Sequence, residues 1–157
     1  MTKFTMDYTG RQVDVLAFDG STDFGAVMLQ QTLAQPGQGG KITAGIQKLA
    51  QRFVLELLTI KGTICYDPDR GTNFMLEAQT GQLNTQLDVY GAFARAVDQI
   101  GINLVGDEVA SDPLDERFDS ATIDSIAVEP GVAHIYVTLN SRAANSRSVL
   151  IPITLSL

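Results

Sequence analysis

The chain has no tryptophan, one cysteine and one histidine among its 157 residues. The lone Cys65 excludes an internal disulfide, so we expect the protein to be made in a reducing compartment. The eleven basic residues are scattered along the sequence, and the formal net charge is -7. This charge argues against nucleic acid or an anionic membrane as the main partner, because both require clustered Lys and Arg.

Long hydrophobic runs are also missing, and no stretch approaches the length of a membrane span. Asp7 lies where a secretory signal peptide would need an apolar segment, so we expect no signal peptide. The hydrophobic fraction of 45% and the length are sufficient for one globular domain with its own core.

The first 40 residues differ in composition from the rest. Residues 12–18 alternate partly between apolar and polar side chains and predict a strand, whereas residues 19–40 are irregular and rich in Gln and Gly. We therefore divide the chain into an N-terminal strand with an irregular arm, residues 1–40, and a main domain, residues 41–157.

Two helices are predicted in the main domain from apolar residues that recur every three or four positions. The first helix begins near residue 42, and its apolar face is Ile42, Ile46, Leu49, Phe53 and Leu57. The second runs from about residue 83 to residue 100 and ends before Gly101. Its expected apolar face is Leu83, Leu87, Tyr90, Ala94, Val97 and Ile100.

After the acidic connection at residues 106–120 the apolar period changes to two, which predicts three strands. Their inward residues are Ile126 and Val128, then Ile135, Val137 and Leu139, then Val149, Ile151, Ile153 and Leu155. Tight turns at residues 129–132 and 140–145 join them. The predicted fold is α+β, with two main helices packed on a small, mostly antiparallel sheet that ends in a three-stranded meander.

Two glycine-containing loops are candidate binding sites. Residues 37–43 are Gly-rich and lead into a helix, but Ile42 stands where a phosphate loop needs Ser or Thr. Residues 67–71 resemble the start of a calcium loop, but Ala78 stands where that loop needs Glu. We predict neither a cofactor nor a metal ion, and we interpret these segments as a helix lead-in and a turn.

Candidate catalytic groups are few. Cys65 and His134 could form a nucleophilic pair, but we expect Cys65 to be a buried structural thiol and His134 to point away from the core. The acidic residues of 106–120 offer no distinct acid and base for glycoside cleavage, and a solvated loop explains them equally well. Arg117 lies among these carboxylates and is suited to a fixed hydrogen-bonding node or an interface; an ordinary surface ion pair is the alternative. We therefore predict no catalytic residues.

Residues 57–72 carry a resemblance to a known family. Leu57-Leu58-Thr59-Ile60-Lys61-Gly62-Thr63 is followed by Asp67-Pro68-Asp69-Arg70-Gly71-Thr72, between two predicted helices. This order resembles the gene-25-type baseplate wedge proteins, the sheath initiators of contractile bacteriophage tails. Their pattern is Leu-Leu-Thr, a Gly-Glu or Gly-Ser pair, and Pro-Asp-Phe-Gly. Thr63 and Arg70 depart from it.

The family also has a Glu-Pro-Arg motif before its final strands, and Asp115-Glu116-Arg117 occupies that place without the proline. The resemblance covers roughly residues 45–155. It implies a structural, ring-forming virion protein, present in the host cytoplasm during assembly. The implied partners are the tail sheath protein, baseplate wedge proteins and the tail tube.

In this interpretation the last strand is an edge to which sheath strands can add. Pro152 fits that position because proline cannot donate a backbone hydrogen bond. The predicted interface residues are Asp115, Glu116, Arg117, Val149, Ile151, Ile153 and Leu155. A small tail-associated, lysozyme-like hydrolase and a free-standing binding module remain the alternatives.

Overall fold

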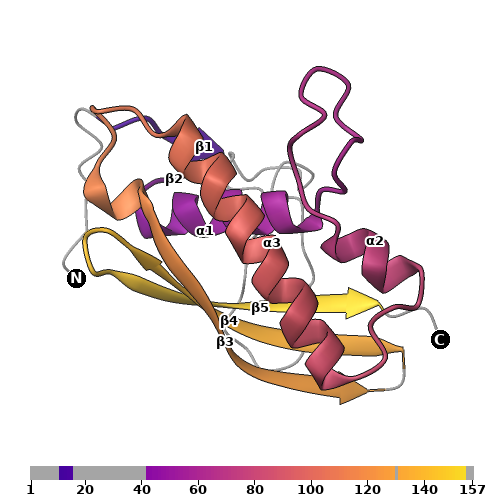
Figure 1. Cartoon of the computed structure of the whole chain (residues 1–157). Coiled ribbons are helices and arrows are strands. Elements are labelled where there is room, and N and C mark those ends of the chain that lie inside the picture. Colours follow the sequence, from indigo (N-terminus) through magenta and orange to yellow (C-terminus); the bar gives the residue numbers. More distant parts are fainter. Residues whose placement is uncertain (1–10, 16–41, 130, 155–157) are drawn as a thin grey trace, which may run out of the picture.

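The computed structural model describes residues 11–15, 42–129 and 131–154, and they form an α+β fold (Figure 1). The elements in chain order are β1 (Asp14–Val15), β2 (Ile42–Thr43), α1 (Ile46–Leu58), α2 (Phe74–Gln79), α3 (Gln86–Asp107), the 3-10 helix η2 (Leu114–Glu116), β3 (Phe118–Glu129), β4 (Val132–Ser141) and β5 (Ser146–Thr154). The predicted arm at residues 19–40 lies outside the described residues.

The last three strands form the predicted antiparallel meander, in the order β3-β4-β5. Burial alternates along β4, so that Ile135, Val137 and Leu139 have no solvent exposure while His134 and Tyr136 face the other side. Period-two patterning of this kind fixes which face of a strand is buried. The predicted inward residues of β4 are confirmed.

α1 buries the predicted face through Leu49, Phe53 and Leu57, each at most 1% exposed. The helix begins four residues later than predicted, because Ile42 belongs to β2, which pairs antiparallel with β1. Gly45 precedes the helix with a φ of 63°, a conformation that Gly adopts without strain. The predicted strand at residues 12–18 is seen as β1, and residues 16–18 lie outside the described residues.

α3 differs from its prediction in both extent and orientation. Its first turn is closed by a capping box between Thr85 and Asp88, and it continues through Gly101 to Asp107. A Cβ on Gly101 would lie 3.4 Å from the Phe118 ring, so this glycine allows close helix–strand packing rather than ending the helix. The buried residues are Val89, Ala92, Phe93, Ala96, Ile100 and Leu104.

Half of the predicted apolar face of this helix was therefore wrong, whereas Ile100 is buried and Val97 packs partly buried against the core. Leu87 is 79% exposed, Tyr90 is 42% exposed and Ala94 is also exposed. Leu83 is buried but precedes the helix, and among the predicted set only Ile100 lies on the fully buried face of α3. Apolar residues occur on both faces of α3, and packing against α1 and the sheet selects one of them.

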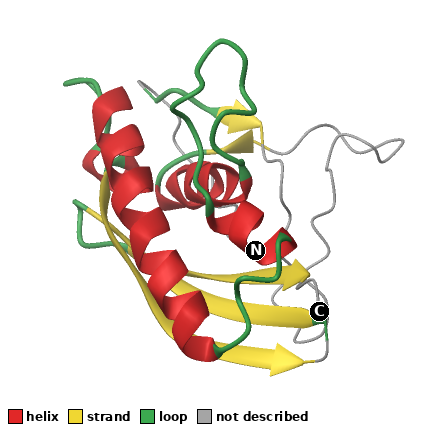
Figure 2. Ribbon diagram, turned by 45° about the vertical axis from the view of Figure 1, so that its right-hand side comes forward, coloured by secondary structure: helices red, strands yellow, loops and turns green. Residues whose placement is uncertain are grey.

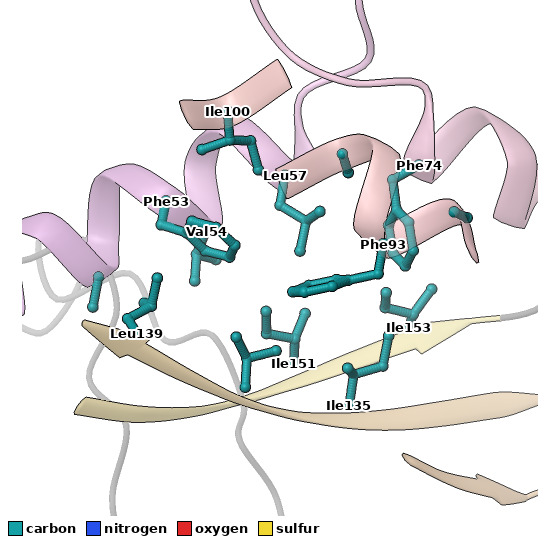
Figure 3. Packing of buried hydrophobic residues seen from close by; sticks show 14 of the residues in the cluster. Phe53, Val54, Leu57, Phe74, Phe93, Ile100, Ile135, Leu139, Ile151 and Ile153 are labelled. Atoms are coloured by element: carbon teal, nitrogen blue, oxygen red, sulfur yellow. The ribbon is translucent and has the colours of Figure 1, made fainter. Parts of the chain in front are cut away.

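One hydrophobic core lies between the helices and the sheet (Figure 3). The rings of Phe53 and Phe118 stack with their centroids 6.1 Å apart, and Phe93 lies between Phe53 and Phe74 at 6.2 and 6.3 Å. Aromatic pairs at these separations add about 0.5–1.5 kcal/mol beyond the burial of their area. These contacting rings connect α1, α2, α3 and β3. The loops that join these elements therefore begin and end at residues held by the core.

Candidate functional site

The predicted acidic interface motif folds onto the beginning of α1. Glu116 is 5% exposed, and its two oxygens accept hydrogen bonds from the Gly45 backbone N–H at 3.0 Å and from Lys48 Nζ at 2.9 Å. Asp115 accepts from Arg11 Nη1 at 2.8 Å and is more exposed. The buried carboxylate is thus fully engaged with groups that precede or begin α1.

Glu116 provides the N-terminal capping group that the residues at the start of α1 lack. Gly45 has no side chain to cap the helix, and the first turn of α1 contains no acidic residue. A carboxylate at a helix N-terminus binds unpaired backbone N–H groups and interacts favourably with the helix dipole. Because Glu116 comes from the segment before β3, it ties the last part of the domain to its first helix.

Arg117 is a hydrogen-bonding node, but its acceptors differ from those expected. Nε donates to the carbonyl of Asp112 at 3.1 Å, and Nη2 donates to the carbonyls of Val109 and Ala110 at 3.2 and 2.9 Å. The guanidinium therefore fastens the loop after α3 through backbone carbonyls and not through the neighbouring carboxylates. A planar donor fork is well suited to several acceptors in one plane.

A second charged cluster surrounds Arg70 near the base of the loop between α1 and α2. Arg70 Nη1 lies 3.0 Å from Glu56 of α1, and its Nη2 donates to Asp107 at the end of α3. Arg52 also contacts Asp107, at 3.2 Å. Partial burial of Arg70 opposes its charge, but the hydrogen bond to Asp107 and the carboxylates of Glu56, Asp107 and Asp67 together raise the pKa of Arg70.

Arg70 is one of the two departures from the family pattern, so the sequence pattern did not identify it as a site residue. Its contacts show what it does here, since it joins α1, α3 and the loop in one network. Glu56 completes the network by accepting hydrogen bonds from Gly71 N–H and from Asn103 Nδ2, both at 3.1 Å. The sequence separations of Arg70 from Glu56 and from Asp107 match no helical or strand period, so only the folded chain reveals the cluster.

The loop itself is closed at its base by backbone hydrogen bonds. Thr72 N–H donates to Thr59 O at 2.8 Å and Lys61 N–H donates to Thr72 O at 3.0 Å. Compact loops with neighbouring ends of this kind are frequently functional. In Figure 1 the loop extends away from the helices and the sheet.

Residues near the tip of this loop face solvent. Tyr66 is 91% exposed, and Cys65 is exposed as well. The prediction that Cys65 is a buried thiol was therefore wrong. An apolar neighbour such as Ile64 indicated burial, but the closed base at Thr59 and Thr72 directs the intervening residues outward.

The predicted interface strand β5 lies at one edge of the sheet, paired only with β4 among the described strands. Ile151 and Ile153 are 3% and 2% exposed and belong to the core, and Val149 is half-buried. The side chains of these two isoleucines are therefore occupied, and a partner at this edge would bind the backbone. Leu155 lies outside the described residues.

Other kinds of site receive little support from the described part of the chain. No group of three or more His, Cys, Asp or Glu side chains there is placed to hold a metal ion. A cleft of about 150 Å³ lies between α2 and α3, beside the Arg95–Glu77 ion pair, below the ~300–1,000 Å³ of typical ligand pockets. Among the described helices, none combines the length and apolarity required to cross a bilayer.

No family model matches the chain, and no curated protein or solved structure matches it either.

Proposed function

We propose that this protein is a structural component of a contractile phage-tail baseplate that initiates sheath assembly. In this function the edge of β5 accepts a strand of the first sheath layer. The proposal combines the resemblance of residues 45–155 to sheath initiators with one structural observation. That observation is the contrast between the two edges of the β3-β4-β5 sheet.

The β3 edge is poorly suited to accept another strand. Its register with β4 shifts between Phe118 and Ser120 and again between Ile123 and Ser125. Such irregularities bend an edge and interrupt the row of backbone groups. Asp119 and Asp124 add negative charge along the same strand, and charge on an edge opposes strand addition.

The β5 edge has neither feature. β5 pairs with β4 over nine consecutive positions, from Val132 opposite Thr154 to Asn140 opposite Ser146, without a register shift. Arg147 is the only charged residue in the strand. Pro152 removes one backbone donor, but the remaining residues offer a regular row of N–H and C=O groups to an incoming strand.

Strand addition at this edge would extend the meander with backbone hydrogen bonds and leave the core unchanged. Backbone pairing of this type supplies affinity, and alternate side chains supply specificity. Ile151 and Ile153 hold β5 against α1 and α2, so the edge is already ordered before a partner arrives. An ordered edge loses little conformational entropy on binding, which suits a template.

The proposal includes the location and partners that the resemblance implies. The protein would assemble as a ring in the virion, between the baseplate and the sheath, and would contact wedge proteins and the tail tube through surfaces other than the β5 edge. Asp115 and Arg117 would act by holding the domain together, since their present contacts are within the chain.

The test removes outward backbone donors from β5 while keeping the fully buried Ile151 and Ile153 in place. Deleting residues 149–157 would also remove Ile151 and Ile153 from the core, so point substitutions are preferable. Adjacent residues of an antiparallel strand direct their N–H groups to opposite sides. Of Val149→Pro and Leu150→Pro, one therefore breaks pairing with β4 and the other removes only an outward donor. The variant that loses only an outward donor keeps its pairing with β4, so it should have the higher melting temperature. Thermal unfolding followed by circular dichroism identifies it.

Thr122→Pro and Ile123→Pro on β3 provide the matched control pair, selected in the same way. Each stable variant is mixed with purified sheath protein, and sheath polymerisation is measured by sedimentation and negative-stain electron microscopy. We expect the β5 variant to lose nucleation and the β3 variant to retain it. Retained nucleation by the β5 variant, or equal loss in both, would refute the use of this edge. Gold-labelled antibody on tails tests the location separately, and label absent from the baseplate end would refute the virion assignment.

A further inference from the structure

The outward face of α3 carries large apolar residues near both ends of the helix, with small residues and Asp98 between them. Leu87 is 79% exposed, Ile102 is 69% exposed, and Val105 and Tyr90 are 44% and 42% exposed. Single exposed apolar residues are normal on protein surfaces, whereas a continuous set of them marks an interaction site. We name these four residues, together with Gly91, Ala94 and Asp98, the α3 outer stripe.

The stripe follows from helix geometry. At about 100° per residue, the seven positions fall within a sector of roughly 120°, which also contains Gly101, the glycine that packs near Phe118. The buried residues from Val89 to Leu104 occupy the opposite side, which packs on α1 and the sheet. Figure 2 shows α3 at the surface of the fold. Asp98 is the only charged residue in the stripe, and Arg95 lies at its border.

We propose that the α3 outer stripe binds the same stripe of a second copy of this chain, with the two helices antiparallel around a two-fold axis that crosses the stripe at the level of Ala96 along the helix. This inference does not rest on the proposed function. Its first support is the symmetric placement of the apolar residues. Leu87 and Val105 each lie nine residues from Ala96, and Tyr90 and Ile102 each lie six residues from it. Antiparallel pairing therefore places Leu87 of each copy opposite Val105 of the other, near both ends of the interface, whereas Tyr90 and Ile102 lie on opposite borders of the stripe.

The charges give a second, independent support for the antiparallel direction. Asp98 lies two residues after Ala96, and Arg95 lies one residue before it. The two-fold axis places Asp98 of each copy beside Arg95 of the other, so the single acid of the stripe gains an opposite charge. Parallel pairing would instead place the two Asp98 carboxylates together, which is unfavourable. The antiparallel arrangement also sets the helix dipoles in opposite directions.

Arg95 is available for this contact. It forms an ion pair with Glu77 at 2.8 Å, but its side chain remains 66% exposed. Near the axis the stripe contains Gly91 and Ala94, whose small size lets two helix backbones approach closely. A symmetric pair of identical surfaces is the commonest form of soluble oligomer. α3 has 22 residues, and the stripe from Leu87 to Val105 extends about 27 Å along it.

The first test measures the oligomeric state of the full chain by sedimentation equilibrium. We expect a reversible dimer. Leu87→Glu and Ile102→Glu should each raise the dimer dissociation constant by at least about 100-fold, because each substitution acts twice in a symmetric interface. Leu55→Glu on α1 is the matched control, since Leu55 is also exposed, at 43%, and it should leave the dimer intact. Circular dichroism checks that each variant is folded.

The second test measures the direction of pairing by cross-linking in a Cys65→Ser background, since the native thiol is exposed. In the antiparallel dimer, the two Leu87→Cys residues, one from each chain, are about 27 Å apart along the helix axis. Each lies close to position 105 of the other chain. A short bis-maleimide should therefore cross-link a mixture of the Leu87→Cys and Val105→Cys chains but neither chain alone.

A wild-type chain that stays monomeric would overturn the proposal and leave the stripe for a different protein. A dimer in which Leu87→Cys cross-links to itself would overturn the antiparallel arrangement. A dimer that both glutamate variants leave unchanged would show that another surface pairs. Asp98→Arg provides the charge test, because it would gather four cations at the axis and should weaken association at least about tenfold.

Discussion

Replacing Gly71 with alanine tests whether the closed base of the α1–α2 loop is important for stability. Gly71 has a φ of 84°, and an added Cβ would overlap the carbonyl oxygen of Thr59. That oxygen accepts the hydrogen bond from Thr72 N–H at 2.8 Å. Because the obstructing atom belongs to the backbone, the base of the loop must open to admit the methyl group.

Gly62 offers a matched control within the same loop. Its φ is 86°, and an added Cβ would have no neighbour within 4 Å. Gly62→Ala therefore measures the cost of the left-handed backbone alone, about 1 kcal/mol after the entropy lost by the unfolded chain is included. Gly71→Ala adds the loss of a hydrogen bond at the buried Thr72, about 1–3 kcal/mol. We expect total losses of about 1 and about 2–4 kcal/mol.

Urea unfolding followed by far-ultraviolet circular dichroism measures both values, with the slope m compared to confirm that the unfolded states are similar. A loss in Gly71→Ala equal to that in Gly62→Ala would contradict this prediction, since it would mean that the contact with Thr59 imposes no constraint. A loss of this size is readily measurable, because small domains have total stabilities of roughly 5–15 kcal/mol.

Two further predictions concern charged groups. Glu116→Ala should destabilise the fold by about 2–4 kcal/mol, because it removes the carboxylate that pairs with the half-buried Lys48 and that accepts from the Gly45 backbone N–H. Asp115→Ala should cost about 1 kcal/mol or less, as its ion pair is more exposed, and equal losses in urea unfolding would contradict this. Asp88 accepts hydrogen bonds from the hydroxyl and the backbone N–H of Thr85, and these lower the pKa of Asp88. A lowered pKa in the folded state gives stability that is complete above the unfolded value of about 3.9 and is lost as the pH falls through the folded value. Asp88→Asn should therefore be less stable than wild type at pH 7, and the difference should shrink in acid; a difference that stays constant down to pH 3 would contradict the capping contribution.

The antiparallel meander was predictable because two signals agree for each strand. The period-two pattern indicates which face is buried, and the turns at both ends fix where the strand begins and ends. Ile135, Val137 and Leu139 alternate with polar or half-buried neighbours, and one register satisfies all of them. The face of α1 was predictable for the same reason, since Leu49, Phe53 and Leu57 have no rival set of apolar residues.

The short helix α2 was missed because its six residues are too few to show a period. The solvent position of Cys65 was missed for a different reason. Exposure there depends on the hydrogen bond between Thr72 and Thr59 that closes the loop, and a contact between distant residues leaves no local pattern.

Local period and turn chemistry encode the α+β class, the order of the main elements and the inward faces of α1 and β4, so these features were predictable before the fold was known. Which of two apolar faces α3 buries was not, since both match a helical period and the choice depends on the surfaces that α1 and the sheet present. The same holds for the capping of α1 by Glu116 and for the link that Arg70 makes between α1 and α3. Those contacts connect residues far apart in the chain, and their energy exists only once the core has brought the elements together.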